Sequence, residues 1–150
     1  RVGRDRLADA AAAAAHYPLP CMTVDMGTAT TYNVLSTEGC FLGGFIVPGV
    51  QTSLRAISAG TAQLPPIAAE PPEHLVGRNT VEALNNGAMF GTAAMLDGLA
   101  NRVEAELGQP LTVVATGGLA PYIMPCCKRK ILYDGDLLFK GLALIWERNS

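Results

Sequence analysis

The segment from Cys21 to Val47 constrains the fold of this chain more than any other part of the sequence. It contains short strand-like runs at residues 21–25, 30–36 and 40–47, separated by turn-forming residues. β-Branched and aromatic side chains occur in the second and third runs, and Thr37-Glu38-Gly39 between them is typical of a hairpin. The segment therefore predicts consecutive strands, of which the last two form an antiparallel hairpin.

Helical patterns lie on both sides of these strands. Residues 5–16 are rich in alanine, the strongest helix former, and we expect Asp5 to cap that helix. Further helices are expected at 50–59, from Asn79 or Thr80 to Leu107 with Gly108 as its stop, at 120–127 and at 136–148, and further strands at 111–115 and 131–133. The prolines within 60–73 exclude a helix or a central strand and predict an ordered surface loop.

This order of elements indicates a fold class. Antiparallel strands followed by helical crossovers predict a mixed α/β sheet with flanking helices. The order is that of a ribonuclease-H-like half-domain, which is usually paired with a second half in the sugar kinase, actin and Hsp70 (ASKHA) superfamily.

Gly87, Gly91 and Gly98 lie inside the longest predicted helix. Each glycine weakens a helix by about 1 kcal/mol relative to alanine, so their presence needs a reason. The small-residue face predicts packing on the sheet, a break near Gly87, or contact with a second helix across a dimer interface.

Composition excludes several partners. The 150 residues are 49% hydrophobic and 16% charged, which is typical of a globular protein. The net charge is -2 and no basic patch stands out, so we expect no nucleic acid, and we interpret Lys128-Arg129-Lys130 as a solvated edge. No apolar run reaches the length of about 18 residues that a membrane span needs.

The cysteines give information about the compartment. They stand at positions 21, 40, 126 and 127 with no CxxC pair, and no histidine cluster accompanies them, so a zinc site is not expected. We interpret all of them as reduced thiols of a cytoplasmic protein.

Asp25-Met26-Gly27-Thr28-Ala29-Thr30 is the first candidate site. A carboxylate at a strand end can hold a cation, and glycine and threonine in the next turn can approach and bind a phosphate. Taken alone, the pattern fits an ordinary hairpin at least as well. Thr116-Gly117-Gly118 lies between a strand and a helix, so it could accept a nucleotide on bare backbone or form a tight turn.

Two helix starts also carry polar groups. In Gly3-Arg4-Asp5-Arg6 the carboxylate between cations should stay ionised, so Asp5 could accept a proton from a hydroxyl or simply cap the helix. In Gly77-Arg78-Asn79-Thr80 the exposed N–H groups and a hydroxyl could hold a small polar ligand, or serve only for capping.

Taken together, the motifs GxDRLA, VDxGTATTYxV, FLGGxIxPGVQTSLRAI, GRNTVEAxxxG, VxATGGLAP and DxxLxxKGLxLIxERN resemble the type III pantothenate kinases. The resemblance covers residues 2–149. It implies phosphorylation of pantothenate by ATP with Mg²⁺, the first step of coenzyme A biosynthesis, in a cytoplasmic homodimer that needs K⁺ or NH₄⁺.

The resemblance also implies roles for particular residues. Asp5 would be the base for the pantothenate hydroxyl, and Asp25 would bind the monovalent cation. The residues expected to contact pantothenate are Gly3, Arg4, Asp5, Arg6 and Thr80, and those expected to contact ATP are Gly27, Thr28, Gly117 and Gly118.

Several features depart from the family pattern. A small residue usually stands at Arg4, and Asp often stands at Asn33. The chain begins without Met and contains no first DxGNT motif, so we expect residues 1–150 to be the C-terminal lobe of a two-lobe kinase, inactive alone. These departures leave open the alternative of a non-catalytic regulatory or partner-binding relative.

Overall fold

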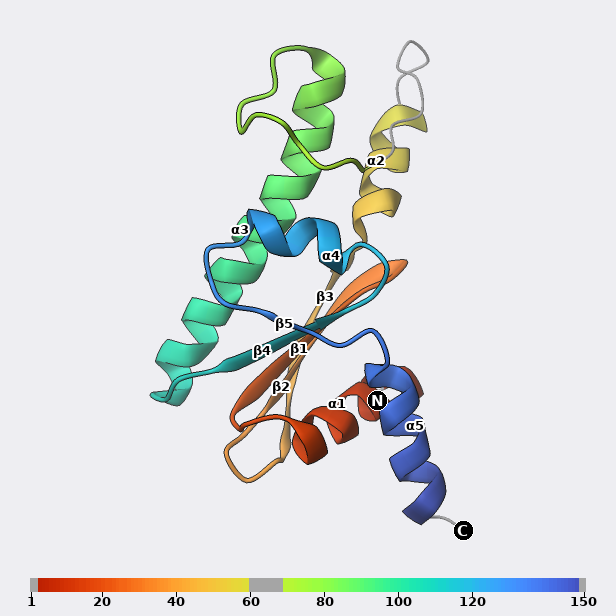
Figure 1. Ribbon diagram of the computed structural model, residues 1–150, viewed down its shortest axis with the longest axis vertical. Helices are drawn as coiled ribbons and strands as arrows, with labels where there is room; N and C mark the ends of the chain where they lie inside the picture. Colours follow the sequence, from red (N-terminus) through yellow and green to blue (C-terminus); the bar gives the residue numbers. More distant parts are fainter. Residues whose placement is uncertain (1–2, 60–68, 149–150) are drawn as a thin grey trace.

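The fold is a five-stranded mixed sheet between two layers of helices (Figure 1), in a computed structural model that describes residues 3–59 and 69–148. The elements in chain order are α1 (Arg4–His16), β1 (Cys21–Met26), β2 (Ala29–Leu35), β3 (Phe41–Pro48), α2 (Val50–Ala59), α3 (Thr80–Leu107), β4 (Thr112–Thr116), α4 (Ala120–Ile123), the 3-10 turn η1 (Met124–Cys126), β5 (Leu132–Tyr133) and α5 (Leu137–Arg148).

The strand order is β3-β2-β1-β4-β5. β1 pairs antiparallel with β2 and β2 with β3, whereas β1 pairs parallel with β4 and β4 with β5. The predicted hairpin and the predicted mixed sheet are therefore confirmed. Because β1, β4 and β5 are parallel, their carboxyl ends lie at one edge of the sheet, and Asp25 on β1 stands opposite Thr31 on β2 and Thr116 on β4.

Alternation along β1 divides the core into two clusters. On one face α2, α3 and α4 cover a cluster that includes Met22, Val24 and Met26. On the other face α1 and α5 cover a smaller cluster that includes Cys21 and Leu137. Side chains of β1 between the buried apolar ones, such as Asp25, therefore point towards α1.

α3 is a single helix, so the predicted break near Gly87 is wrong. Asn79 caps it by accepting the backbone N–H of Glu82 at 2.9 Å, and Gly108 ends it at φ 68°. Within the described residues, and apart from the backbone of α3 itself, a Cβ added at Gly87, Gly91 or Gly98 would meet no atom within 4 Å. These glycines do not pack on the sheet, so no described segment covers the small-residue face.

Two predicted helix ends differ from the structure. Gly3, not Asp5, is the N-cap of α1, and Asp5 lies in its first turn. The helix predicted at 120–127 divides into α4 and η1, since Pro125 has no N–H to continue the α-helical bonding.

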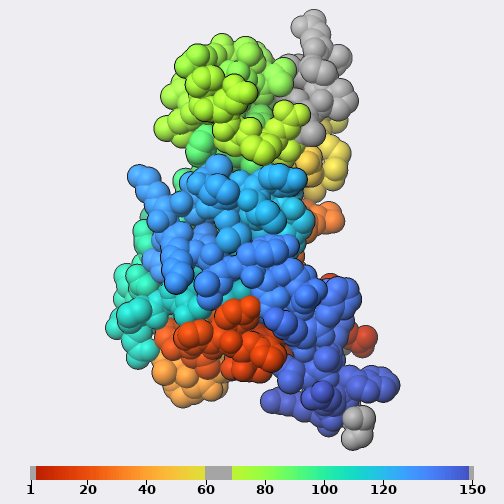
Figure 2. Space-filling model, in the orientation of Figure 1, coloured from red at the N-terminus to blue at the C-terminus, as the bar shows by residue number. Residues whose placement is uncertain are grey.

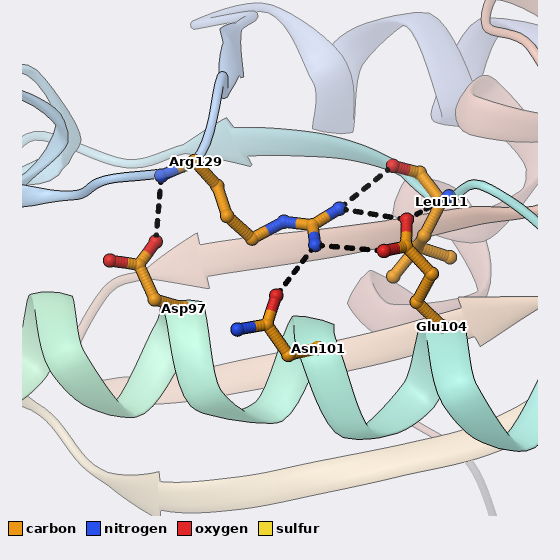
Figure 3. Close-up of polar contacts among 5 residues, drawn as sticks. All are labelled: Asp97, Asn101, Glu104, Leu111 and Arg129. Carbon is orange, nitrogen blue, oxygen red and sulfur yellow. Dashed lines mark hydrogen bonds and ion pairs between the residues drawn. The ribbon is translucent and has the colours of Figure 1, made fainter.

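Arg129 is not part of a solvated edge, contrary to the prediction. Its guanidinium forms hydrogen bonds with both carboxylate oxygens of Glu104 at 3.2 Å, with Asn101 at 2.7 Å and with the Leu111 carbonyl at 3.2 Å (Figure 3). Asp97 accepts the backbone N–H of Arg129 at 3.2 Å. This cluster anchors the segment before β5 to α3, while Lys128 and Lys130 are exposed as expected.

The remaining expectations concern cysteines, membranes and the proline-rich loop. All four cysteines are free. Among residues 3–59 and 69–148, no helix is long and apolar enough to cross a bilayer. Residues 60–68 of the predicted loop lie outside the described residues, and the part from Ala69 onward is held by Asn85, whose amide pairs with both backbone groups of Glu70.

Candidate nucleotide and acceptor site

The Gly27-Thr28 turn between β1 and β2 is exposed, and hydrogen bonds from the start of α2 hold it in place. The Thr28 carbonyl accepts the Gly49 N–H at 3.1 Å and the Thr52 hydroxyl at 3.0 Å. A Cβ at Gly49 would collide with the carbonyls of Gly27 and Thr28, so this approach requires glycine. The turn is therefore both a hairpin connection and a rigid, exposed backbone loop.

The second glycine turn lies beside the first. Gly117 has φ 100°, and a Cβ there would stand 2.6 Å from the Met26 carbonyl oxygen. Only glycine combines that left-handed conformation with so close an approach to β1. The predicted ATP residues Gly27, Thr28, Gly117 and Gly118 thus come together at the carboxyl edge of β1 and β4. The helix after Gly118 has a single turn, however, so it supplies less of a helix N-terminus than expected.

Asp25 lies between this edge and α1, where it interacts with the Asp9 carboxyl group. Burial raises the pKa of Asp9 to about 8, and the Asp25 and Asp5 carboxylates add to the rise. Burial also raises the pKa of Asp25, while the hydrogen bond with Asp9 opposes that shift and Asp5 increases it. The raised pKa of Asp9 favours its protonated form beside Asp25. Asp5 and Asp25, which the sequence suggested for different roles, lie close enough for their charges to interact.

The other residues of the Gly3–Arg6 segment differ in their surroundings. Gly3, Arg4 and Asp5 are exposed. Arg6 is half-buried, and its Nε donates to the side-chain oxygen of Asn33 on β2 at 2.7 Å.

Thr80 is not brought to this site within one chain. It is exposed at the start of α3, where the capping group Asn79 and the bond from the Arg78 N–H to Glu82 at 2.8 Å shape the helix end. α3 begins at one end of the molecule and α1 lies towards the other (Figures 1 and 2). The two expected pantothenate contacts are therefore separate surfaces in the monomer.

Sequence reasoning missed Asp9, Gly49 and Thr52. Asp9 is hidden in an alanine-rich helix, yet it follows Asp5 by four positions, which places both on one helix face. Gly49 follows Pro48, a pair that the sequence marks only as the end of the sheet. Gly49 and Thr52 contact Thr28 because of the way α2 packs, and no local sequence pattern predicts that packing.

The arrangement offers a partial fit to a small cation. The Asp25 carboxyl group is half-buried at the end of β1, and among the described residues the neighbouring Asp9 Oδ1 is a buried oxygen without a hydrogen-bond partner. Within the described part of the chain, no three or more His, Cys, Asp and Glu side chains gather as a metal site. The donors present suit a monovalent ion sharing Asp25 better than a fully protein-coordinated divalent ion.

Strand order, crossovers and glycine turns at one sheet edge are those of the ribonuclease-H-like fold found in the sugar kinase, actin and Hsp70 superfamily. Solved structures agree on the fold. A protein from Campylobacter jejuni described as a Baf family transcriptional activator matches with TM-score 0.66 at 24% identity over 99% of this chain and 65% of the other. The ethanolamine utilization protein EutJ from Carboxydothermus hydrogenoformans matches with TM-score 0.54 at 18% identity over 93% and 53%.

The sequence comparisons are more specific. The family model for type III pantothenate kinase matches residues 1–102. Type III pantothenate kinases from Hyphomonas neptunium and Phenylobacterium zucineum are each 42% identical over 99% of this chain, and one from Dehalococcoides mccartyi is 43% identical over the same share. The chain belongs to the type III pantothenate kinase family. It spans 58% of the length of these relatives.

Proposed function

We propose that the protein containing this chain transfers the γ-phosphoryl group of ATP, supplied with Mg²⁺, to the hydroxyl of pantothenate, giving 4'-phosphopantothenate for coenzyme A biosynthesis. The observation that carries the proposal is that both glycine turns and Asp25 meet at one edge of the sheet in a member of this family, with Asp5 near enough to act on Asp25 through its charge. The chain would be one lobe of a two-lobe kinase in the cytoplasm. Its unpaired cysteines are consistent with that compartment.

The residues at the sheet edge would divide the work of phosphoryl transfer. Gly27 and Thr28 would bind the ATP phosphates through backbone N–H groups and the hydroxyl, and Gly117 with Gly118 would lie beside the nucleotide. Asp5 would accept the proton of the pantothenate hydroxyl as its oxygen attacks the γ-phosphorus and ADP leaves. Because this reaction depends mainly on positioning and charge, weak base assistance from an exposed carboxylate suffices.

A monovalent cation would offset negative charge where the phosphates meet the carboxylates. Asp25 would hold it, with the unpartnered Asp9 Oδ1 adjacent. The raised pKa of Asp9 favours a protonated group beside Asp25, which supports this role for Asp25.

The acceptor site would be completed by a second copy of the chain. Pantothenate is expected to contact Gly3–Arg6 and Thr80, yet these lie on separate surfaces of the monomer (Figure 1). A homodimer in which α3 of one copy reaches the α1 region of the other would bring them together. In support, an apolar groove of about 350 Å³ between α2 and α3 includes the open Gly87 and Gly91.

The function is tested with the full-length protein by following ADP release from ATP with and without pantothenate, in K⁺, NH₄⁺ and Na⁺ buffers. We expect pantothenate-dependent release, and Asp5→Asn should lower kcat at least about 100-fold by removing the general base, with unchanged thermal unfolding. Arg102→Ala, an exposed change on α3, is the matched control.

Two results would count against this assignment. Absence of pantothenate-dependent release under every cation would reject the kinase and favour a regulatory relative, which should also bind neither ATP nor pantothenate tightly. Near-normal turnover of Asp5→Asn would remove Asp5 from the role of base while leaving the kinase in place.

A further inference from the structure

We propose that Arg6 is a positioning residue whose side chain fixes the first turn of α1, and with it Asp5, to the sheet. In this view Arg6 does not recognise the substrate through its charge. The inference rests on the proposed function, since the group that it positions is the proposed base.

The guanidinium of Arg6 is already engaged by the sheet. Nε donates to Asn33 Oδ1 at 2.7 Å, and Nη2 donates to the Tyr32 carbonyl at 3.3 Å. The guanidinium carbon lies 5.6 Å from the centre of the Phe41 ring, within cation–π range. These contacts involve both β2 and β3, so Arg6 spans from the helix to two strands.

The acceptor of Arg6 is itself rigid. Asn33 is fully buried and donates through Nδ2 to the Thr23 hydroxyl at 3.0 Å. Thr23 stands opposite Asn33 in the β1–β2 register. A buried amide that is held from both sides has one orientation, so Asn33 presents its oxygen to Arg6 at a fixed place.

β3 leaves room for the guanidinium. Gly44 stands opposite Asn33 in the β2–β3 register. A Cβ at Gly44 would lie 2.9 Å from Arg6 Nη2 and would collide with the Tyr32 carbonyl. The glycine, the buried amide and the aromatic ring together form a socket for one arginine, supplied by residues distant from it in the sequence.

The socket matters because the first turn of α1 is otherwise weakly fixed. Gly3 makes no side-chain cap, and, its chain neighbours aside, no atom of residues 3–59 and 69–148 lies within 4 Å of where its Cβ would be. Asp5 is exposed in that turn, directly before Arg6. A displacement of about 1 Å at a catalytic group can cost on the order of 100-fold in rate, so an anchor one residue away has a catalytic effect.

The departure at Asn33 fits this role. An Asp in its place would accept from Arg6 as a charged partner, and the Thr23 hydroxyl could rotate to donate to it. Both residue types therefore preserve the socket, whereas an apolar residue would leave Arg6 Nε without its side-chain acceptor.

The test uses full-length protein carrying Arg6→Ala, Asn33→Ala, the double variant and Asn33→Asp. Steady-state kinetics with pantothenate give kcat and KM, and thermal unfolding gives stability. If Arg6 positions Asp5, each alanine variant lowers kcat about 10- to 100-fold with KM for pantothenate changed less than about threefold. The double variant should be no worse than either single variant, and Asn33→Asp should retain kcat within about threefold.

Leu96→Ala separates positioning from general weakening of the core. It leaves a cavity in the cluster on the face of the sheet away from α1, so it should lower the unfolding temperature while kcat stays within about threefold of wild type. A kcat loss equal to that of Arg6→Ala would mean that instability, not Asp5 placement, causes the effect.

Two further outcomes distinguish a failure of this inference from a failure of the proposed function. Arg6→Ala raising KM at least about tenfold at unchanged kcat, with Asn33→Ala near wild type, would make Arg6 a substrate ligand and overturn the inference. Wild-type protein without pantothenate-dependent ADP release would reject the kinase function itself, and with it any role of Arg6 in placing a base.

Discussion

At the scale of single residues, the main electrostatic feature of the site is the buried carboxyl group of Asp9 on α1. Asp9 is almost fully buried, and its carboxyl lies against Asp25, with Asp5 close by. A buried acid among carboxylates keeps its proton, since ionisation would add charge without water to solvate it. The raised pKa of Asp9 therefore favours a neutral carboxyl group beside Asp25.

The raised pKa of Asp9 predicts a pH-dependent stability. Its ordinary pKa is 3.8, and in the folded protein it is about 8, so the folded state binds the proton more tightly. That stabilisation is complete below about pH 4 and is lost as the pH rises through about 8. Stability attributable to Asp9 therefore decreases between these values.

Asp9→Asn should remove this dependence, because the amide keeps a donor to Asp25 and cannot ionise. Thermal unfolding from pH 4 to 9 should show the variant gaining on wild type as the pH rises, with the largest difference near pH 9. Glu106→Gln, an exposed change, serves as the control. A constant difference between variant and wild type across the range would contradict a buried proton at Asp9.

At the scale of elements, α1 and α5 pack with their backbones in close contact. A Cβ at Gly141 would collide with the carbonyl of Ala8. Glycine at this position lets two helix backbones approach, and this approach closes the face of the sheet opposite α3. The sequence shows Gly141 only as a helix-weakening residue, because the partner backbone is far away in the chain.

Two glycine-to-alanine changes should therefore have opposite effects. Gly141→Ala should destabilise the protein by about 1–3 kcal/mol through overpacking. Gly98→Ala, inside α3 where the added Cβ meets nothing within 4 Å, should be neutral or stabilising by up to about 1 kcal/mol. Urea unfolding of both variants checks this. Equal destabilisation by the two would show that helix context, and not backbone contact, sets the cost.

At the scale of the whole molecule, the open groove between α2 and α3 is the surface that should pair with a second copy. Met95 is 41% exposed and lines it. Met95→Glu should place a charge in an apolar interface and shift full-length dimer towards monomer, at least about tenfold in Kd, as measured by sedimentation velocity.

The matched control for this change lies further along α3. Arg102→Glu alters charge outside the groove and should leave the association unchanged. A Met95→Glu protein that remains as tightly dimeric as wild type would place the interface elsewhere.

Local sequence was enough to determine the elements of this protein and their order. Hairpin residues, alanine content, the Asn79 cap and the Gly108 stop act over a few residues, so the strands, the long helix and the family resemblance follow from the chain itself. Contacts between distant residues were decided only by the tertiary structure, because they depend on which faces meet. The sequence shows Arg6 and Asn33, Asp9 and Asp25, or Arg129 and Glu104 as separate residues, and only packing of the helices on the sheet makes each pair a single unit. The Gly27-Thr28 turn between β1 and β2 likewise becomes a candidate phosphate loop only when Gly49, Thr52 and Gly117 pack around it.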